Sequence, residues 1–343
     1  MKKILLCFAI FCGLLGVFLL CPVAVFGQIA PLEKIFYLAP YNALSGEASL
    51  DKNWQNIDIL APQFYTVNSS MKLVGKLDVN LKKIIAKHNL KVMPLVTNAS
   101  FSQKIIHDLL MAPNVQNTLA NTLVTIAKKD NYIGWQFDFE NINYQDKDLF
   151  TAFVQRVYPV LKKNNLIFSV AVVPRTTDYE DTDAFKNWGG AYDYSAIAQS
   201  CDFVSLMTYD DSNSVGPAAS IAFDNNVLKY VKDKIPASKL SLGVPLYYWK
   251  WDVAGNKKIG AGSYKNLLFI MENFRYSFGF NLDLGVSWLT YVVKNKEYKI
   301  WFEDNNSFQK KLDIVKANNL RGFSAWLLGS EDPAIWSSLS TSH

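Results

Sequence analysis

Beyond its first 27 residues the sequence contains little cysteine and little histidine. Three of the 4 cysteines lie within residues 1–27, so the rest of the chain retains only Cys201 and can form no internal disulfide. The 3 histidines are scattered without the spacing of metal ligands, so no metal ion and no other cofactor is expected. A domain without disulfides depends on its core, and roughly 315 residues bury enough apolar surface for one. Cys201 adjoins the apolar run 203–207 and is expected to be a small, buried hydrophobe.

A strong excess of charge of either sign is also absent. The formal net charge of +5 falls by two, to +3, when Lys2 and Lys3 are removed, and the remaining charges are dispersed. So mild a charge gives no reason to expect a nucleic-acid partner. The sequence has no Pro- or Ser-rich linker, no internal repeat and no low-complexity tract, which favours one domain over residues 28–343. We expect this domain to act as a monomer.

One long hydrophobic run is present, and it lies at the start of the chain. Lys2 and Lys3 precede an almost wholly apolar stretch, Ile4–Phe26, and cleavage is plausible before Gln28. Residues 1–27 are therefore predicted to be a signal peptide, and the protein is expected to be secreted, periplasmic or in the cell envelope. The alternative is an uncleaved membrane anchor, because the run is long enough to span a bilayer. A lipoprotein is disfavoured because no small residue precedes Cys21.

Short apolar runs rich in β-forming residues alternate with longer amphipathic stretches. Two of these stretches, residues 77–87 and 149–163, place apolar side chains at helical spacing. The runs predict eight strands, at residues 34–38, 57–65, 90–96, 132–142, 166–172, 203–209, 240–246 and 322–326. Eight strand–helix units in one domain predict an α/β fold, and specifically a (β/α)8 TIM barrel. The long gap between strands seven and eight predicts a small β-containing (α+β) insertion at about residues 250–300.

The fourth predicted strand ends in two carboxylates. Apolar and polar residues alternate from Tyr132 to Ile142, and a strand has a period of two, so Asp138 and Glu140 lie on the same face. Two adjacent like charges disfavour joint ionisation, so the pKa of one carboxyl group rises. A carboxyl group that stays protonated near neutral pH can act as a general acid. The alternative is a solvated strand end, but the apolar and aromatic flanks argue against an ordinary solvated edge.

Other polar and aromatic residues end neighbouring strands. In (β/α)8 barrels the chemistry is located at the C-terminal ends of the strands. Gln63 and Tyr65 end the second predicted strand, Tyr209 and Asp210 end the sixth, and Trp326 ends the eighth. Together they predict an open cleft with aromatic walls. Such a cleft suits a sugar, whose apolar faces stack on aromatic rings while its hydroxyls form hydrogen bonds. For any single aromatic residue, packing in the core is the alternative.

These residues resemble the motifs of glycoside hydrolase family 18, the chitinase family, and most closely those of the spore-cortex and peptidoglycan N-acetylglucosaminidases. The strand-four signature of the family is D-x-x-D-x-D-x-E, and its last two acidic positions coincide with Asp138 and Glu140. The N-x-D-F-E-N form found in the peptidoglycan branch agrees with residues 138–141. Other segments resemble family motifs in the family's order, within about residues 34–338: 63–67, 188–194, 206–210, 242–247, 300–304 and 322–329.

The resemblance implies a retaining, substrate-assisted hydrolase of β-1,4-linked N-acetylglucosamine glycans. Glu140 would protonate the glycosidic oxygen, and the substrate's own N-acetyl carbonyl would attack the anomeric carbon. Asp138 would orient the acetamide and stabilise the oxazolinium, with Tyr209 completing the catalytic set. The implied substrate-binding residues are Gln63, Tyr65, Gln136, Met207, Asp210, Tyr247 and Trp326. The polysaccharide is expected to be peptidoglycan or its fragments rather than chitin, because the motifs fit that branch better.

The chain also departs from the family pattern. The two earlier aspartates of the strand-four signature fall on Ile133 and Gln136. On a strand the Gln136 amide shares the face of Asp138, and it is expected to donate a hydrogen bond to that carboxylate. The glycine-rich strand-three motif of chitinases is replaced by residues 95–99.

Two other functions are compatible with the sequence. A catalytically silent, lectin-like protein that binds N-acetylglucosamine glycans would use the same barrel. Gln136 favours this alternative, whereas Glu140 argues against it, because silent relatives usually lose the acid. An unrelated barrel enzyme that uses the same carboxylates is the third interpretation. The leading hypothesis is the glycoside hydrolase.

Overall fold

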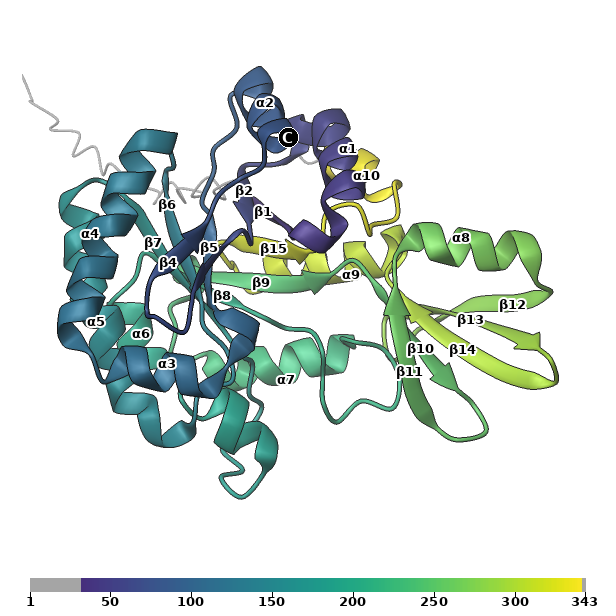
Figure 1. Ribbon diagram of the computed structural model, residues 1–343. Helices are drawn as coiled ribbons and strands as arrows, with labels where there is room; N and C mark the ends of the chain where they lie inside the picture. Colours follow the sequence, from purple (N-terminus) through teal and green to yellow (C-terminus); the bar gives the residue numbers. More distant parts are fainter. Residues whose placement is uncertain (1–31, 341–343) are drawn as a thin grey trace, which may run out of the picture. The chain divides into compact units, whose positions relative to one another are not determined.

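Strands and helices alternate along residues 32–340, the part of the chain that this computed structural model describes (Figure 1). The expected signal peptide, residues 1–27, lies outside the described residues. The larger of two sheets contains a series of parallel strands: β1 (Glu33–Leu38), β2 (Ile59–Pro62), β5 (Leu95–Asn98), β6 (Gly134–Asp138), β7 (Ile167–Val172), β8 (Phe203–Leu206), β9 (Leu240–Pro245) and β15 (Gly322–Trp326).

The hydrogen-bonded order of these strands follows the chain around a curled sheet. The order is β2-β1-β15-β9-β8-β7-β6-β5, so the last strand of the chain lies beside the first. The two ends of the series also meet, because the Leu60 amide donates to the Lys91 carbonyl and the Met93 amide donates to the Leu60 carbonyl, both at 2.9 Å. This arrangement is consistent with a TIM barrel, in which no parallel strand is left with an unpaired edge.

Helices connect the strands and cover the outside of the curled sheet (Figure 1). They are α1 (Ala43–Asn53), α2 (Val79–His88), α3 (Gln103–Leu110), α4 (Pro113–Asp130), α5 (Lys147–Lys163), α6 (Tyr194–Gln199), α7 (Ile221–Val231), α9 (Asn305–Ala317) and α10 (Ile335–Ser340). Side chains buried between helices and strands form the largest hydrophobic core, which includes Cys201. The prediction that Cys201 is a buried hydrophobe is confirmed.

A smaller apolar cluster fills the inside of the curled sheet. It includes Ile35 and Tyr37 from β1, Leu95 from β5 and Phe203 from β8, with Trp326 packed against it. Burying each such side chain contributes roughly 1.5–3 kcal/mol. The strands are therefore buried on both faces, as expected for parallel sheets covered by helices.

A second sheet occupies the chain between β9 and β15. Its five strands are antiparallel, in the order β11-β10-β14-β13-β12. Their bounds, with those of the helix α8 between β11 and β12, are β10 (Tyr248–Asp252), β11 (Lys257–Gly262), α8 (Tyr264–Asn273), β12 (Tyr276–Asn281), β13 (Val286–Val293) and β14 (Lys296–Phe302). One face packs against α8 through Leu267 and Ile270, and the other presents a row of tryptophans. The segment expected as an insertion, about residues 250–300, falls within this sheet.

Prolines explain why two observed strands differ from the predicted runs. The predicted strand 57–65 is interrupted after Pro62, and its end forms β3 (Tyr65–Val67), which pairs with β4 (Leu73–Gly75) and with β5. In the third run, regular pairing begins only after Pro94. Proline has no amide hydrogen to donate to a neighbouring strand, so each ladder is broken at these positions.

Candidate active site

A cavity of about 810 Å³ lies among the residues that end or follow the parallel strands. Seven of the ten predicted site residues line it: Gln63, Asp138, Glu140, Met207, Tyr209, Asp210 and Trp326. Tyr41, Phe101 and Trp188 add aromatic surface to its walls. An acidic centre with aromatic walls is a suitable site for a sugar, which offers both apolar ring faces and hydroxyl groups.

The alternation of β6 determines which of its side chains reach the cavity. Phe137 and Phe139 point the other way and are fully buried, with the Phe137 ring stacked on Phe153 of α5 at a centroid distance of 5.1 Å. Because successive strand residues point to opposite faces, Asp138 and Glu140 are directed inward. The sequence prediction that the two carboxylates share a face therefore agrees with their common place in the cavity lining.

Asp138 is the last residue of β6, and only 3 % of its surface is exposed. Gln63 Nε2 donates a hydrogen bond to Asp138 Oδ2 at 3.1 Å. The other oxygen, Oδ1, is buried and has no hydrogen-bond partner among the described residues. Burial raises the pKa of Asp138 to about 6, and the hydrogen bond from Gln63 opposes this rise.

Glu140 lies two residues beyond Asp138 and is partly exposed to the cavity. Its backbone is fixed by Asn98, the last residue of β5: the Glu140 amide donates to Asn98 Oδ1 at 3.1 Å, and Asn98 Nδ2 donates to the Glu140 carbonyl at 3.0 Å. Burial, and then the charges of Asp138 and Asp210, raise the pKa of Glu140 well above its ordinary value. The raised pKa favours the protonated form of Glu140, which is the form that a general acid needs.

Tyr209 follows β8 and reaches the cavity because the neighbouring strand has a glycine. A Cβ atom on Gly243 would lie 2.9 Å from Tyr209 Cε1 and 2.5 Å from the Leu206 carbonyl oxygen, closer than packed atoms allow. Thr208 Oγ1 donates to the Gly243 carbonyl at 2.7 Å and fixes the same turn. The glycine in the motif 242–247 thus allows the close approach that places the Tyr209 ring.

Asp210 is oriented by a tyrosine from the following strand connection. Its backbone has a left-handed φ of +56°, which turns the chain sharply after Tyr209. Tyr247 Oη donates a hydrogen bond to Asp210 Oδ1 at 2.6 Å. Tyr247 was predicted to bind substrate, but it is not among the cavity-lining residues and instead holds Asp210.

Gln136 does not make the predicted hydrogen bond to Asp138. The side chain is fully buried, and its oxygen accepts from Tyr37 Oη at 2.8 Å. Its nitrogen donates to Ser169 Oγ at 2.9 Å and to Ser205 Oγ at 2.8 Å. All of these groups lie inside the curled sheet, and Gln136 does not line the cavity. The shared strand face was predicted correctly, but the Gln136 amide forms its hydrogen bonds with hydroxyl groups on other strands.

Tyr65 is also separate from the cavity. It begins β3, beyond the break after β2, and only 3 % of its surface is exposed. Its hydroxyl lies 2.9 Å from that of Tyr132, and its ring meets Trp135 edge-on at a centroid distance of 5.0 Å. Tyr65 therefore packs in the core, which was the alternative for any single aromatic residue. The break after β2 changes the direction in which the Tyr65 side chain points.

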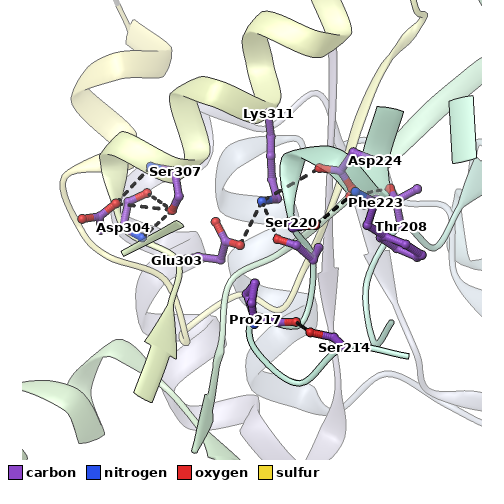
Figure 2. Close-up of polar contacts among 12 residues, drawn as sticks. Thr208, Ser214, Pro217, Ser220, Phe223, Asp224, Glu303, Asp304, Ser307 and Lys311 are labelled. Carbon is purple, nitrogen blue, oxygen red and sulfur yellow. Dashed lines mark hydrogen bonds and ion pairs between the residues drawn. The ribbon is translucent and has the colours of Figure 1, made fainter. Parts of the chain in front are cut away.

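A second group of buried charges contacts the loop that carries Tyr209 and Asp210 (Figure 2). Lys311 Nζ of α9 lies 3.0 Å from Glu303 Oε1 and 4.0 Å from Asp224 Oδ2 of α7, and donates to the Ala219 carbonyl at 3.2 Å. All three charged side chains are almost completely buried. Burial raises the pKa of Asp224 to about 7, against the lowering effect of Lys311.

The same loop is tied to the second sheet. Trp251 Nε1 of β10 donates to the Gly216 carbonyl at 2.8 Å, and Ala218 packs among the tryptophans of that sheet. Within the loop, the Asp211 amide donates to the Ala218 carbonyl at 3.0 Å. Ser214 Oγ donates to the Pro217 carbonyl at 2.7 Å (Figure 2). These contacts hold the loop in a fixed shape beside the cavity.

Several cavity residues were not predicted from the sequence. Tyr37 was missed because it lies within an apolar run. Asn98, which does not line the cavity but holds the Glu140 backbone, was also missed, although the strand-end rule applied to the other strands would have found it. Arg175 and Trp188 come from the long connection after β7. Arg175 is the only basic residue among those that line the cavity, and it pairs with Asp178 at 2.9 Å rather than with the two central carboxylates.

Residues 32–340 offer neither a metal centre nor a membrane-spanning helix. No group of three or more histidine, cysteine or acidic side chains in this range could hold a metal ion. In the same residues no helix is both long enough and apolar enough to cross a membrane.

Two adjacent carboxylates with raised pKa values, at the strand ends of a curled α/β barrel, are compatible with a glycan-cleaving hydrolase. Comparison with known families gives the same class. The sequence profile described as glycosyl hydrolases family 18 matches residues 34–331. The chain therefore belongs to glycosyl hydrolase family 18, and it is a glycosidase.

Relatives of the chain include bacterial glycosylases. It is 25 % identical over 300 residues to the uncharacterized glycosylase YvbX of Bacillus subtilis, covering 85 % of this chain and 86 % of the relative. It is 30 % identical over 271 residues to the cortical fragment-lytic enzyme of Bacillus subtilis, covering 76 % of this chain and 62 % of that enzyme's length. The crystal structure of the Bacillus megaterium spore cortex-lytic enzyme SleL superposes with a TM-score of 0.80 at 27 % identity, over 90 % of this chain and 73 % of the other.

Proposed function

We propose that this protein hydrolyses β-1,4-linked N-acetylglucosamine glycans by a retaining, substrate-assisted mechanism. The observation that carries the proposal is the pair at the end of β6: Glu140 has a strongly raised pKa, and Asp138 beside it offers an unpaired oxygen. The first group is suited to donate a proton. The second is suited to accept a hydrogen bond from an acetamide N–H and to stabilise a neighbouring positive charge.

In the first half of the reaction, Glu140 donates its proton to the glycosidic oxygen, and the bond from that oxygen to the anomeric carbon breaks. The carbonyl oxygen of the substrate's N-acetyl group bonds to the anomeric carbon, which gives a cyclic oxazolinium ion. Asp138 orients the acetamide and stabilises the cation. In the second half, Glu140 accepts a proton from water, whose oxygen bonds to the anomeric carbon and opens the ring with retained configuration.

The remaining cavity residues hold the sugar in this scheme. Tyr209 and Asp210 hold the acetamido group, and Trp326 supports the apolar face of the ring at the site of cleavage. The Trp326 side chain is only partly buried, and its ring lies 5.5 Å from that of Tyr37, which also lines the cavity. Met207 and Gln63 complete the lining around the two carboxylates.

We propose peptidoglycan or its fragments as the substrate in preference to chitin. The support is the agreement of residues 138–141 with the peptidoglycan branch, together with relatives named as cortical fragment-lytic and spore cortex-lytic enzymes. We also propose a secreted or envelope location, which rests on the charged start and apolar run of residues 1–27.

The mechanism is tested with a thiazoline analogue of N-acetylglucosamine, which mimics the oxazolinium ion. Competitive inhibition, with binding tighter than that of the substrate, is expected because mimics of reactive intermediates bind more tightly than substrates. Products from peptidoglycan and chitin, identified by mass in parallel, decide the substrate. Equal cleavage of glycans that lack the N-acetyl group would contradict substrate assistance and indicate a protein nucleophile.

A further inference from the structure

The side-chain amide of Gln63 lies beside Asp138, and the reaction scheme gives it no step of its own. Gln136 stands where the family signature has an aspartate, but both ends of its side chain are occupied by Tyr37 and by serines inside the curled sheet. Gln63 Nε2, at 3.1 Å, is the hydrogen-bond donor that reaches the Asp138 carboxylate from the described residues. It bonds Oδ2 and leaves the buried Oδ1 without a partner among residues 32–340.

We propose that Gln63 is a positioning residue, which holds the Asp138 carboxylate in one orientation so that Oδ1 is free for the acetamide N–H of the substrate. The inference deepens the substrate-assisted mechanism and rests on it for the role of Oδ1. Gln136, which replaces the strand-four aspartate of the family signature, does not orient Asp138 because its amide is bonded to other groups. In this chain a residue that follows β2, across β5 from β6, does so instead.

The backbone of Gln63 is held well enough for this role. It follows Pro62, the last residue of β2, and its amide donates to the Leu38 carbonyl of β1 at 2.9 Å. Its side chain lines the cavity beside Asp138. A donor anchored to two neighbouring strands loses little freedom when it forms a hydrogen bond, so it can fix the orientation of its partner.

The neutral charge of the amide suits the reaction. A lysine or arginine at this position would also donate to Asp138, but its positive charge would oppose the oxazolinium that Asp138 has to stabilise. An aspartate or glutamate would add a like charge and raise the pKa of Asp138 further. An amide donor orients the carboxylate and favours its ionised form while leaving the negative charge of the site in place.

Burial and the Gln63 hydrogen bond are the causes that set the pKa of Asp138. The titratable groups on which its charge acts are one acid and three tyrosines. Glu140 is the acid. Tyr37, Tyr192 and Tyr209 are buried near it, and burial raises the pKa of Tyr37 to about 12 and those of the other two well above the ordinary value. These tyrosines stay neutral through the acidic range. A change in the titration of Asp138 after replacement of Gln63 therefore reports on the lost hydrogen bond.

The test is a carboxyl-carbon NMR titration of Asp138 in the folded full chain, combined with the pH dependence of kcat. Gln63→Leu removes the donor, so the titration of Asp138 and the acidic limb of kcat should both move upward by about one pH unit. The isosteric variant Gln63→Glu should move them further, because it adds a like charge. The matched control is Gln136→Leu, which should lower stability but leave the titration of Asp138 in place.

An unchanged titration in Gln63→Leu and Gln63→Glu would overturn the proposal. A raised KM with an unshifted titration would also overturn it, because Gln63 would then contact substrate without positioning Asp138. The NMR result does not depend on turnover, so it is separate from the mechanism itself. If the titration shifts as expected but the thiazoline analogue does not compete with substrate, the positioning role stands and substrate assistance fails.

Discussion

The pair of carboxylates at the end of β6 and the pair around Lys311 differ in what surrounds them. Asp138 and Glu140 line the cavity, with one amide donor to Asp138 and, among the described residues, no ion pair. Asp224 and Glu303 share Lys311 and are sealed from solvent. Burial is the main cause of the raised pKa in all four groups.

The comparison shows that a raised pKa does not by itself identify a catalytic acid. Lys311 lies 3.0 Å from Glu303 and 4.0 Å from Asp224, and it ties α7, α9 and the end of β14 to the loop before α7 (Figure 2). Such a group contributes to structure, although removal of one partner would leave an uncompensated buried charge. Within residues 32–340 no cation pairs with the cavity carboxylates, so the protein keeps them at a cost in stability, as functional sites commonly do.

The largest expected effect separates the two pairs by activity. Glu140→Gln removes the general acid and should reduce kcat by about 10² to 10⁴, while sugar binding survives. Glu303→Gln is the matched substitution in the other pair, and its folded fraction should retain the kcat of the wild type. Hydrolysis rates, corrected for the folded fraction by circular dichroism, measure both. Wild-type turnover in Glu140→Gln would end the assignment of the acid.

The next effect separates the two pairs by stability, because variants in the two pairs should change the free energy of unfolding in opposite directions. Lys311→Met leaves two buried carboxylates without a cation and should lower the free energy of unfolding by about 3–5 kcal/mol. Glu140→Gln relieves an uncompensated buried acid and should raise it by about 0.5–2 kcal/mol at neutral pH. Urea unfolding of both variants tests this. If both variants were destabilised to a similar degree, the distinction between structural and functional carboxylates would be lost.

A smaller effect concerns the aromatic floor of the cavity. Trp326→Ala should weaken substrate binding by about tenfold, because it removes the surface on which the sugar ring is expected to stack. The substitution should lower the free energy of unfolding by less than the roughly 3–5 kcal/mol that is lost when a fully buried tryptophan is replaced by alanine. Substrate affinity and thermal unfolding are measured on the same sample. Trp326 would belong to the core if the variant unfolded readily while its folded fraction bound sugar normally.

The last effect is on the pH dependence of stability. An unfolded aspartate ionises near pH 4, by its ordinary pKa of about 3.9, whereas Asp224 keeps its proton to about 7. Between these values the unfolded state binds fewer protons, so the wild type should lose stability as pH rises. Asp224→Asn removes this contribution and should gain stability relative to the wild type across the same range. Urea midpoints at several pH values test it, and parallel curves for the two proteins would contradict it.

Most of the parallel strands could be predicted from the sequence because their apolar runs are continuous. The run at 322–326 coincides with β15, and that at 166–172 matches β7 to one residue. The hairpin of β3 and β4 was missed because its strands are three residues each, too short for a period to be visible. The interruptions at Pro62 and Pro94 follow from missing amide hydrogens, which a count of apolar residues does not include.

The site was also predicted only in part, because a sequence pattern gives the direction of a side chain but not its tertiary contacts. Strand-end position and period two correctly directed Asp138 and Glu140 to one cavity. These two rules could not show that Gln136 would bond serines from other strands. A shared face gives the direction of a side chain but does not identify its hydrogen-bond partner. Lys311 was missed since a lysine on a helix normally lies at the surface, and only the tertiary structure brings Glu303 within 3.0 Å of it.

The central claim is that the pair at the end of β6, and not the pair around Lys311, is the chemical centre. The most direct measurement is a carboxyl-carbon NMR titration of Asp138, Glu140, Asp224 and Glu303 in one sample, with and without the thiazoline analogue. We predict that Glu140 holds its proton toward neutral pH, and that the analogue changes the titration of Asp138 and Glu140 only. Binding of the analogue that left these two unchanged, or that instead altered Asp224 and Glu303, would contradict the claim.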